Sequence, residues 1–184
     1  MKFQVKNWIL CILPFLTETM TAQDVMWKRA PVVEKNLIQA LDLTVDTLCQ
    51  EIDLLSCFET VHDFSLGNHD PIEKGQLEGL KDPSQSTAIS LDRVVLLSCQ
   101  KRLSQDHPLF LIKPNQNKAS QYPEQQWIEQ AQEYSRRFLG RQLNEIETGI
   151  SRKFIQDNAA RASAYDLQLM LCFIMGSHLE TIFY

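Results

Sequence analysis

The sequence predicts an all-α protein: an irregular bundle of about four to six helices, with a long loop between the first two main helices. Two observations lead to this fold class. Apolar residues recur at spacings of three and four along several segments, as they do on one face of a helix. Prolines and capping residues stand where these segments begin, and glycine or His107-Pro108 stands where they end. Hydrophobic residues make up 44% of the chain and charged residues 22%, which are ordinary values for a globular domain.

The first helix is expected over residues 31–58, because Pro31 suits a first helical position and an apolar stripe follows it. The stripe consists of Val33, Leu37, Leu41, Val45, Leu48, Ile52 and Leu55. Residues 59–81 are expected to form the long loop, since glycines and the turn sequence Asn68-His69-Asp70-Pro71 interrupt them. Such a length is unusual for a compact domain, so this loop either has a function or contains a short helix.

The second helix is expected to open at Asp82-Pro83-Ser84-Gln85 and to stop before Pro108, which disfavours helical backbone at the preceding residue. After it, residues 109–112 are apolar and predict either a short strand or a loop that lies on the core.

Three further helices are expected in the C-terminal part. One begins at Pro123 and ends at Gly140. The next is capped by Asn144 together with Glu147, and an apolar stripe follows, formed by Ile146, Ile150 and Phe154. The last starts near Ala159 and is apolar all round, which predicts the buried central element of the bundle.

Residues 1–22 have the order of a secretory signal: Lys2 and Lys6, then the apolar run 8–16, then Thr21-Ala22 before Gln23. The run is too short to span a bilayer, which needs about 20 apolar residues, so no transmembrane span is expected in the mature chain. The predicted domains are therefore a signal over residues 1–22 and one helical domain over residues 23–184. If the signal is real, this organisation predicts a protein of the periplasm or the exterior of the cell. The alternative is an amphipathic first helix packed on the domain of a cytoplasmic protein.

Removal of residues 1–22 leaves an even number of cysteines: Cys49, Cys57, Cys99 and Cys172. An exported chain with this content can form disulfides. Cys49 and Cys57 lie eight residues apart on one expected helix, a rise of about 12 Å, whereas bonded cysteines have Cα atoms within about 7 Å. These two are therefore predicted not to bond. We predict instead that Cys49 bonds to Cys99, as antiparallel packing of the first two helices would allow; parallel packing would favour Cys57 as the partner of Cys99.

The composition and motifs argue against several classes of function. A formal charge of −5, with cations scattered among acids, argues against a nucleic-acid surface. The sequence contains no nucleophile elbow, no phosphate-binding glycine loop and no zinc-ligand spacing such as Cys-x-x-Cys. No catalytic residue, cofactor-binding residue, metal ligand or cofactor is therefore assigned.

Three hypotheses for the function remain. The leading one is a non-enzymatic envelope or secreted helical protein that binds or scaffolds another protein. The second is a secreted helical-bundle ligand of the cytokine type. The third is a small enzyme or metal-binding protein, with a site made from the loop over residues 59–82 and His107; His62 and His69 lie in that loop.

Overall fold

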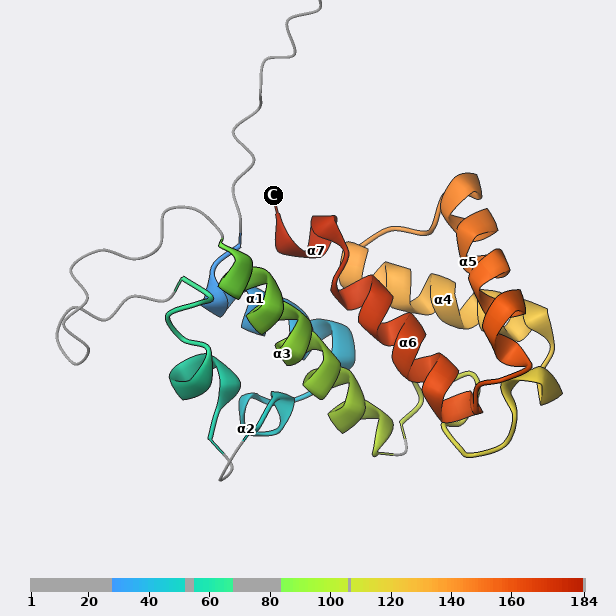
Figure 1. Cartoon of the computed structure of the whole chain (residues 1–184), viewed down its shortest axis with the longest axis horizontal. Coiled ribbons are helices and arrows are strands. Elements are labelled where there is room, and N and C mark those ends of the chain that lie inside the picture. The colour runs from blue at the N-terminus through green and yellow to red at the C-terminus, as the bar shows by residue number, and fades with distance from the viewer. Residues whose placement is uncertain (1–27, 52–54, 68–83, 106, 184) are drawn as a thin grey trace, which may run out of the picture.

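The computed structural model describes residues 28–51, 55–67, 84–105 and 107–183, and this part of the chain is all-α, as the sequence predicts. Its helices form an irregular bundle, shown in Figure 1. In chain order they are α1 Ala30–Leu41, α2 Val45–Leu48, the π-helix η2 Cys57–Val61, α3 Gln85–Leu103, the 3₁₀-helix η3 Ala119–Gln121, α4 Glu124–Leu139, α5 Glu145–Ala159, α6 Ala164–Gly176 and α7 Leu179–Ile182. The predicted signal over residues 1–22 lies outside the described residues.

Helix α6 is the central element, and it packs against α3, α4 and α5 (Figure 1). Leu167, Leu171 and Cys172 on α6 are almost completely buried. Helix α1 packs on α3 and α4, and its N-terminal end contacts the short C-terminal helix α7. The predicted central role of the last helix is therefore confirmed, although α6 begins at Ala164 and not near Ala159. A capping box of Ser163 and Asp166 starts it after a short turn.

Local signals placed the ends of the other C-terminal helices correctly. Gly140 follows α4 with a φ of 71°, a left-handed conformation that glycine adopts without strain. The side chain of Asn144 accepts a hydrogen bond from the Glu147 backbone N–H and so caps α5. At the start of α3 the cap is Ser84 with Thr87 instead of the predicted Asp82, and Asp82 lies outside the described residues.

The predicted helix over residues 31–58 is wrong, because the chain leaves the helix after Leu41. Asp42 has a φ of 52°, and its backbone N–H donates to the carbonyl of Ile38. Arg102 of α3 donates to the carbonyls of Leu41 and Asp42 at 3.2 and 2.8 Å. These bonds satisfy carbonyl groups that a helix C-terminus leaves without partners, so α1 can end here without a glycine.

The early end of α1 also changes the disulfide pairing from the predicted Cys49–Cys99 bond. The short helix α2 ends at Leu48, and Cys49 then has extended backbone. A bridge between Gln50 and Ser56 pairs residues 49–51 with residues 55–57 as the two arms of a hairpin, which brings the Cα atoms of Cys49 and Cys57 to 5.6 Å. Cys49 and Cys57 therefore bond to each other, contrary to the prediction, and Cys99 of α3 bonds to Cys172 of α6.

The apolar segment after α3 is a loop on the core and not a strand. Leu109, Phe110 and Ile112 are buried, and only Leu111 of this segment points outward. Two buried glutamines hold the loop in place. Gln130 of α4 accepts from the Leu111 backbone N–H, and Gln168 of α6 donates to the carbonyl of Ile112 at 2.7 Å.

Candidate protein-binding face

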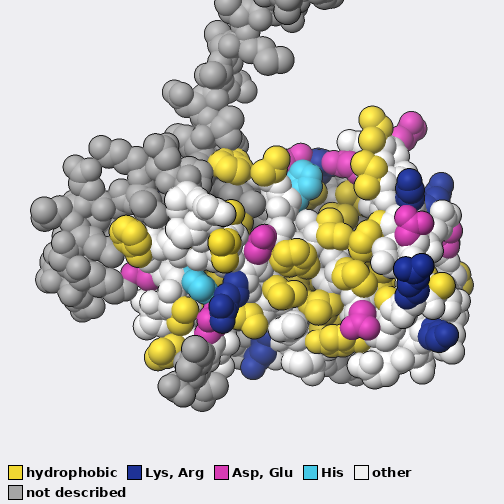
Figure 2. All heavy atoms as spheres, in the orientation of Figure 1, with side chains coloured by type: hydrophobic (Ala, Val, Ile, Leu, Met, Phe, Trp, Pro, Cys, Tyr) yellow, Lys and Arg dark blue, Asp and Glu magenta, His cyan; other side chains and the backbone are white. Residues whose placement is uncertain are grey.

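Large apolar side chains are exposed on α5 and α6, on the side of the molecule that Figure 2 shows. The exposed fractions are 76% for Ile146, 65% for Ile150 and 42% for Ile174. In Figure 2 hydrophobic atoms gather over α6 and extend along the N-terminal part of α5. We call this surface the α5–α6 face and define it by Ile146, Ile150, Phe154, Met170, Phe173 and Ile174. Apolar patches of this kind mark interaction sites on soluble proteins.

A groove runs between the two helices within this face. It has a volume of about 80 Å³ and is lined by Ile150, Ser151, Phe154, Leu171, Ile174 and Met175. Its floor is formed by the buried side chains of Leu171 and Met175, whereas Ile150 and Ile174 stand exposed at its edges. The groove therefore offers an apolar surface that no other helix of the described chain covers.

Two of the three residues in the apolar stripe of α5 do not face the core, contrary to what its sequence suggests, while Phe154 packs against it. Ile146 and Ile150 lie four residues apart and point outward, while the buried residues of α5 are Ser151 and Ile155. Helix α6 has neighbours on only part of its circumference, so Ile174 is left exposed although the helix is apolar all round. Both features come from the way in which the helices pack, and together they make the face.

Charged residues of both signs lie near the α5–α6 face, and Arg161 adds an exposed cation between the two helices. Helix α6 carries one charged residue, the exposed Asp166 in its first turn. Glu145 and Asp157 on α5 are exposed, and Lys153 is an exposed cation of the same helix. The other cation of α5, Arg152, forms an ion pair with Glu124 of α4. The acids of this region exceed its bases by one residue, a small excess that favours positive charges at the edges of an approaching surface.

An arginine clamp joins α5 to α7 near the end of this face. Arg141, in the turn between α4 and α5, donates to Glu147 at 2.8 Å and to Glu180 at 2.7 Å. The bonds from Arg141 and from the Asn144 backbone lower the pKa of Glu147 to about 2. Hydrogen bonds from Arg141 likewise lower the pKa of Glu180. The clamp therefore holds Glu147 and Glu180 together. Each of them directly follows an exposed apolar residue, Ile146 and Leu179 respectively.

We expect Glu147 to remain ionised in the folded protein until the pH falls to about 2. Its folded pKa lies below the ordinary value near 4.3, so the stabilisation by this carboxylate is present above about pH 4 and is lost as the pH falls through the folded pKa. A carboxyl-carbon NMR titration measures this. Arg141→Gln should raise the Glu147 pKa, and Arg152→Gln, which removes a different exposed ion pair, should leave it unchanged. If the pKa of Glu147 were the same in Arg141→Gln as in the unaltered protein, the clamp would be contradicted.

Both carboxylates of the clamp also belong to a group of three residues that have side chains of the kind that can bind a metal ion. Ligand atoms of Glu147, His178 and Glu180 lie within 4.8 Å of one another. The guanidinium of Arg141 donates to both carboxylates and supplies the positive charge between them. The geometry thus describes an ion-pair cluster.

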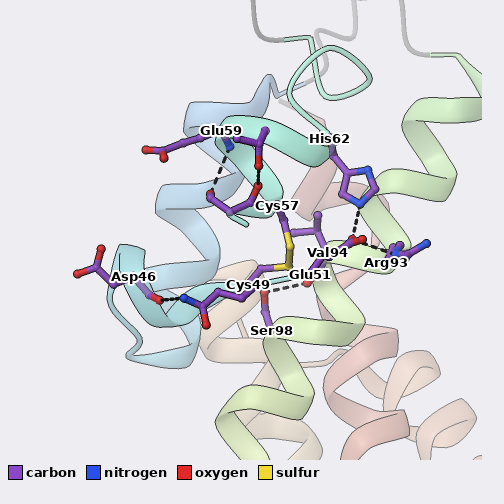
Figure 3. The surroundings of a disulfide bond; sticks show 12 residues. Asp46, Cys49, Glu51, Cys57, Glu59, His62, Arg93, Val94 and Ser98 are labelled. Atoms are coloured by element: carbon purple, nitrogen blue, oxygen red, sulfur yellow. Dashed lines mark hydrogen bonds and ion pairs between the residues drawn. A yellow bond between two sulfur atoms is a disulfide. The ribbon is translucent and has the colours of Figure 1, made fainter. Parts of the chain in front are cut away.

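The histidines of the predicted loop site have different partners on different elements. His62, after η2, contacts the buried carboxylate of Glu51 at 2.5 Å, and Arg93 of α3 contacts the same oxygen at 2.9 Å (Figure 3). His107 contacts Asp42 at the end of α1. Arg93 and the end of α3 at Leu103 are separated by ten residues, or about 15 Å of helix, so these two histidines do not converge. His69 and most of the loop lie outside the described residues.

Comparison with protein-family models, with curated proteins and with solved structures finds no match for this chain. Among the described residues, no helix has the length and apolar character needed to cross a membrane.

Proposed function

We propose that this chain is a non-enzymatic exported protein, a disulfide-bonded helical domain that binds another protein through the α5–α6 face. The observation that carries the proposal is the exposure of Ile146, Ile150 and Ile174 around an apolar groove. Two disulfides support export, because such bonds persist in oxidising compartments such as the periplasm or the exterior of the cell. Export also agrees with a signal over residues 1–22, which would leave Gln23 as the first residue of the mature chain.

The partner segment that best fits this face is an amphipathic helix with lysine or arginine at its edges. A groove between two helices accepts the apolar side chains of a third helix, as in other complexes of the helix-in-groove kind. The acidic residues Glu145, Asp157 and Asp166 favour basic flanks on that helix.

A model peptide tests this binding mode directly. The probe is a helical peptide of about 14 residues, with leucine at positions i, i+3, i+4 and i+7 and lysine on its other face. Ile150→Ser should weaken binding about tenfold, or about 1.4 kcal/mol, because it removes apolar contact area at the groove edge. Ile89→Ser is the matched control, since Ile89 lies on α3 and is 62% exposed. Isothermal titration calorimetry gives the three dissociation constants.

Two outcomes would contradict the proposal. One is an equal affinity of the peptide for the unaltered protein, Ile150→Ser and Ile89→Ser. The other is a concentration-dependent dimer of the free chain in sedimentation that Ile150→Ser abolishes, which would assign the face to a second copy. A peptide with glutamate in place of lysine measures the contribution of charge and should bind more weakly.

A further inference from the structure

The two disulfides have very different surroundings. Cys99 and Cys172 join α3 to α6, the two helices with the closest mutual packing, and both residues are almost fully buried. Cys49 and Cys57 close a hairpin at the edge of the bundle, where a pocket of about 300 Å³ opens. The pocket therefore gives a reactant from solution a route to one of these bonds, whereas the other lies between two packed helices.

The pocket reaches only one of the two hairpin cysteines, Cys49, which is 4% exposed. Cys49 forms part of its lining, together with Val45, Asp46, Gln50, Leu55, Ser56, Glu59 and Thr60. Cys57 does not line it and is completely buried. In Figure 3 the disulfide lies against α3, near Val94 and Ser98, and the carboxylates of Asp46 and Glu59 point away from that helix.

We propose that the Cys49–Cys57 bond is a redox modification site that takes a dithiol reductant through this pocket, while Cys99–Cys172 stays oxidised. A thiolate of the reductant attacks Sγ of Cys49, forms a mixed disulfide there and displaces the sulfur of Cys57, which leaves as a thiolate and takes up a proton. The second thiolate of the reductant then attacks its own sulfur in the mixed disulfide and releases Cys49 as a thiol. Two electrons pass to the protein, and the reductant is left as a disulfide.

The charges at the pocket select among reductants. Asp46 and Glu59 both line it, and the negative charge of Glu59 also raises the pKa of Glu34 on α1, after the larger effect of burial. An attacking thiolate is itself an anion, so further negative charge on its carrier adds repulsion, and positive charge reduces it. The reductant class that fits is a neutral or cationic dithiol.

The first experiment follows the order of reduction in the folded full chain. The protein is treated with increasing dithiothreitol, quenched with acid, alkylated and mapped by mass spectrometry. We expect labels on Cys49 and Cys57 at reductant concentrations that leave the peptides of Cys99 and Cys172 linked. With cysteamine, a monothiol, the trapped mixed disulfide should be on Cys49. Simultaneous reduction of both bonds, earlier reduction of Cys99–Cys172, or an adduct mainly on Cys57 would overturn the proposal.

The second experiment tests the charge selection. Cysteamine is compared with 3-mercaptopropionate at low ionic strength, and each rate is divided by its rate on a small uncharged disulfide. This ratio should favour cysteamine about tenfold and should fall several-fold in the variant Asp46→Asn/Glu59→Gln. The control variant Asp157→Asn/Glu145→Gln removes the same two residue types from α5 and should keep the full ratio. Equal ratios in all three proteins would overturn the selection by these carboxylates.

Discussion

Replacement of both Cys99 and Cys172 by alanine is expected to lower the free energy of unfolding by about 4.5 kcal/mol. The bond closes a chain segment of 73 residues, and the entropy that it removes from the unfolded chain grows with that length. It also joins α3 to the central helix α6, so its loss acts on the middle of the bundle. Urea unfolding at constant pH gives the free energy.

The hairpin disulfide provides a matched control for this measurement. Cys49 and Cys57 are only eight residues apart, and the same chain-entropy treatment gives about 2.5 kcal/mol for replacing both by alanine. The difference of about 2 kcal/mol between the two double variants is the expected result. Equal losses, or a larger loss for the hairpin pair, would show that loop closure does not determine how the two bonds stabilise the fold.

Gln168→Leu is expected to lower the free energy of unfolding by about 3–4 kcal/mol, although leucine fits the apolar composition of α6. Gln168 is completely buried, accepts a hydrogen bond from the hydroxyl of Tyr134 at 2.8 Å and donates to the carbonyl of Ile112 at 2.7 Å. Leucine removes both partners at once. A buried polar group without a partner costs about 1–3 kcal/mol, and this substitution leaves two such groups.

Two further variants separate this effect from a general loss of helix stability. Tyr134→Phe removes one of the hydrogen bonds without adding a new polar group, and a loss of about 1 kcal/mol is expected. Gln156→Leu changes an exposed glutamine of α5 whose amide contacts Glu124, and a change below about 0.5 kcal/mol is expected. A loss for Gln168→Leu no larger than that for Gln156→Leu would contradict the role of the buried network.

Where a helix end depends on neighbouring residues, the sequence was sufficient to predict it. Asn144 caps α5 through Glu147, and Gly140 ends α4 in the left-handed conformation. The end of α1 depends instead on Arg102 and Arg137, which lie 60 and 97 residues away from the carbonyls of Asp42 and Ala40. No local pattern reveals such partners. The continuous helix expected over residues 31–58 was wrong for this reason, and the error carried over to the disulfide pairing.

The α5–α6 face illustrates a second limit of prediction from sequence. An apolar stripe such as Ile146, Ile150 and Phe154 shows that one side of a helix is apolar, but not whether a neighbouring helix covers it. The structure shows that α5 buries a different side, which carries Ser151 and Ile155. Likewise the uniform apolar character of α6 predicted a central helix correctly but did not indicate which part of its surface lacks a neighbour.

An NMR titration of the ¹⁵N-labelled protein with the leucine–lysine peptide tests the proposed binding face most directly. We predict that the amide shifts of α5 and α6 around Ile150 and Ile174 change in a saturable manner. The amides around Ile89 on α3 should stay unaffected, and Ile150→Ser should reduce the changes on α5 and α6. Saturable changes centred on another surface, or no changes at peptide concentrations well above those of the protein, would contradict a binding function for this face.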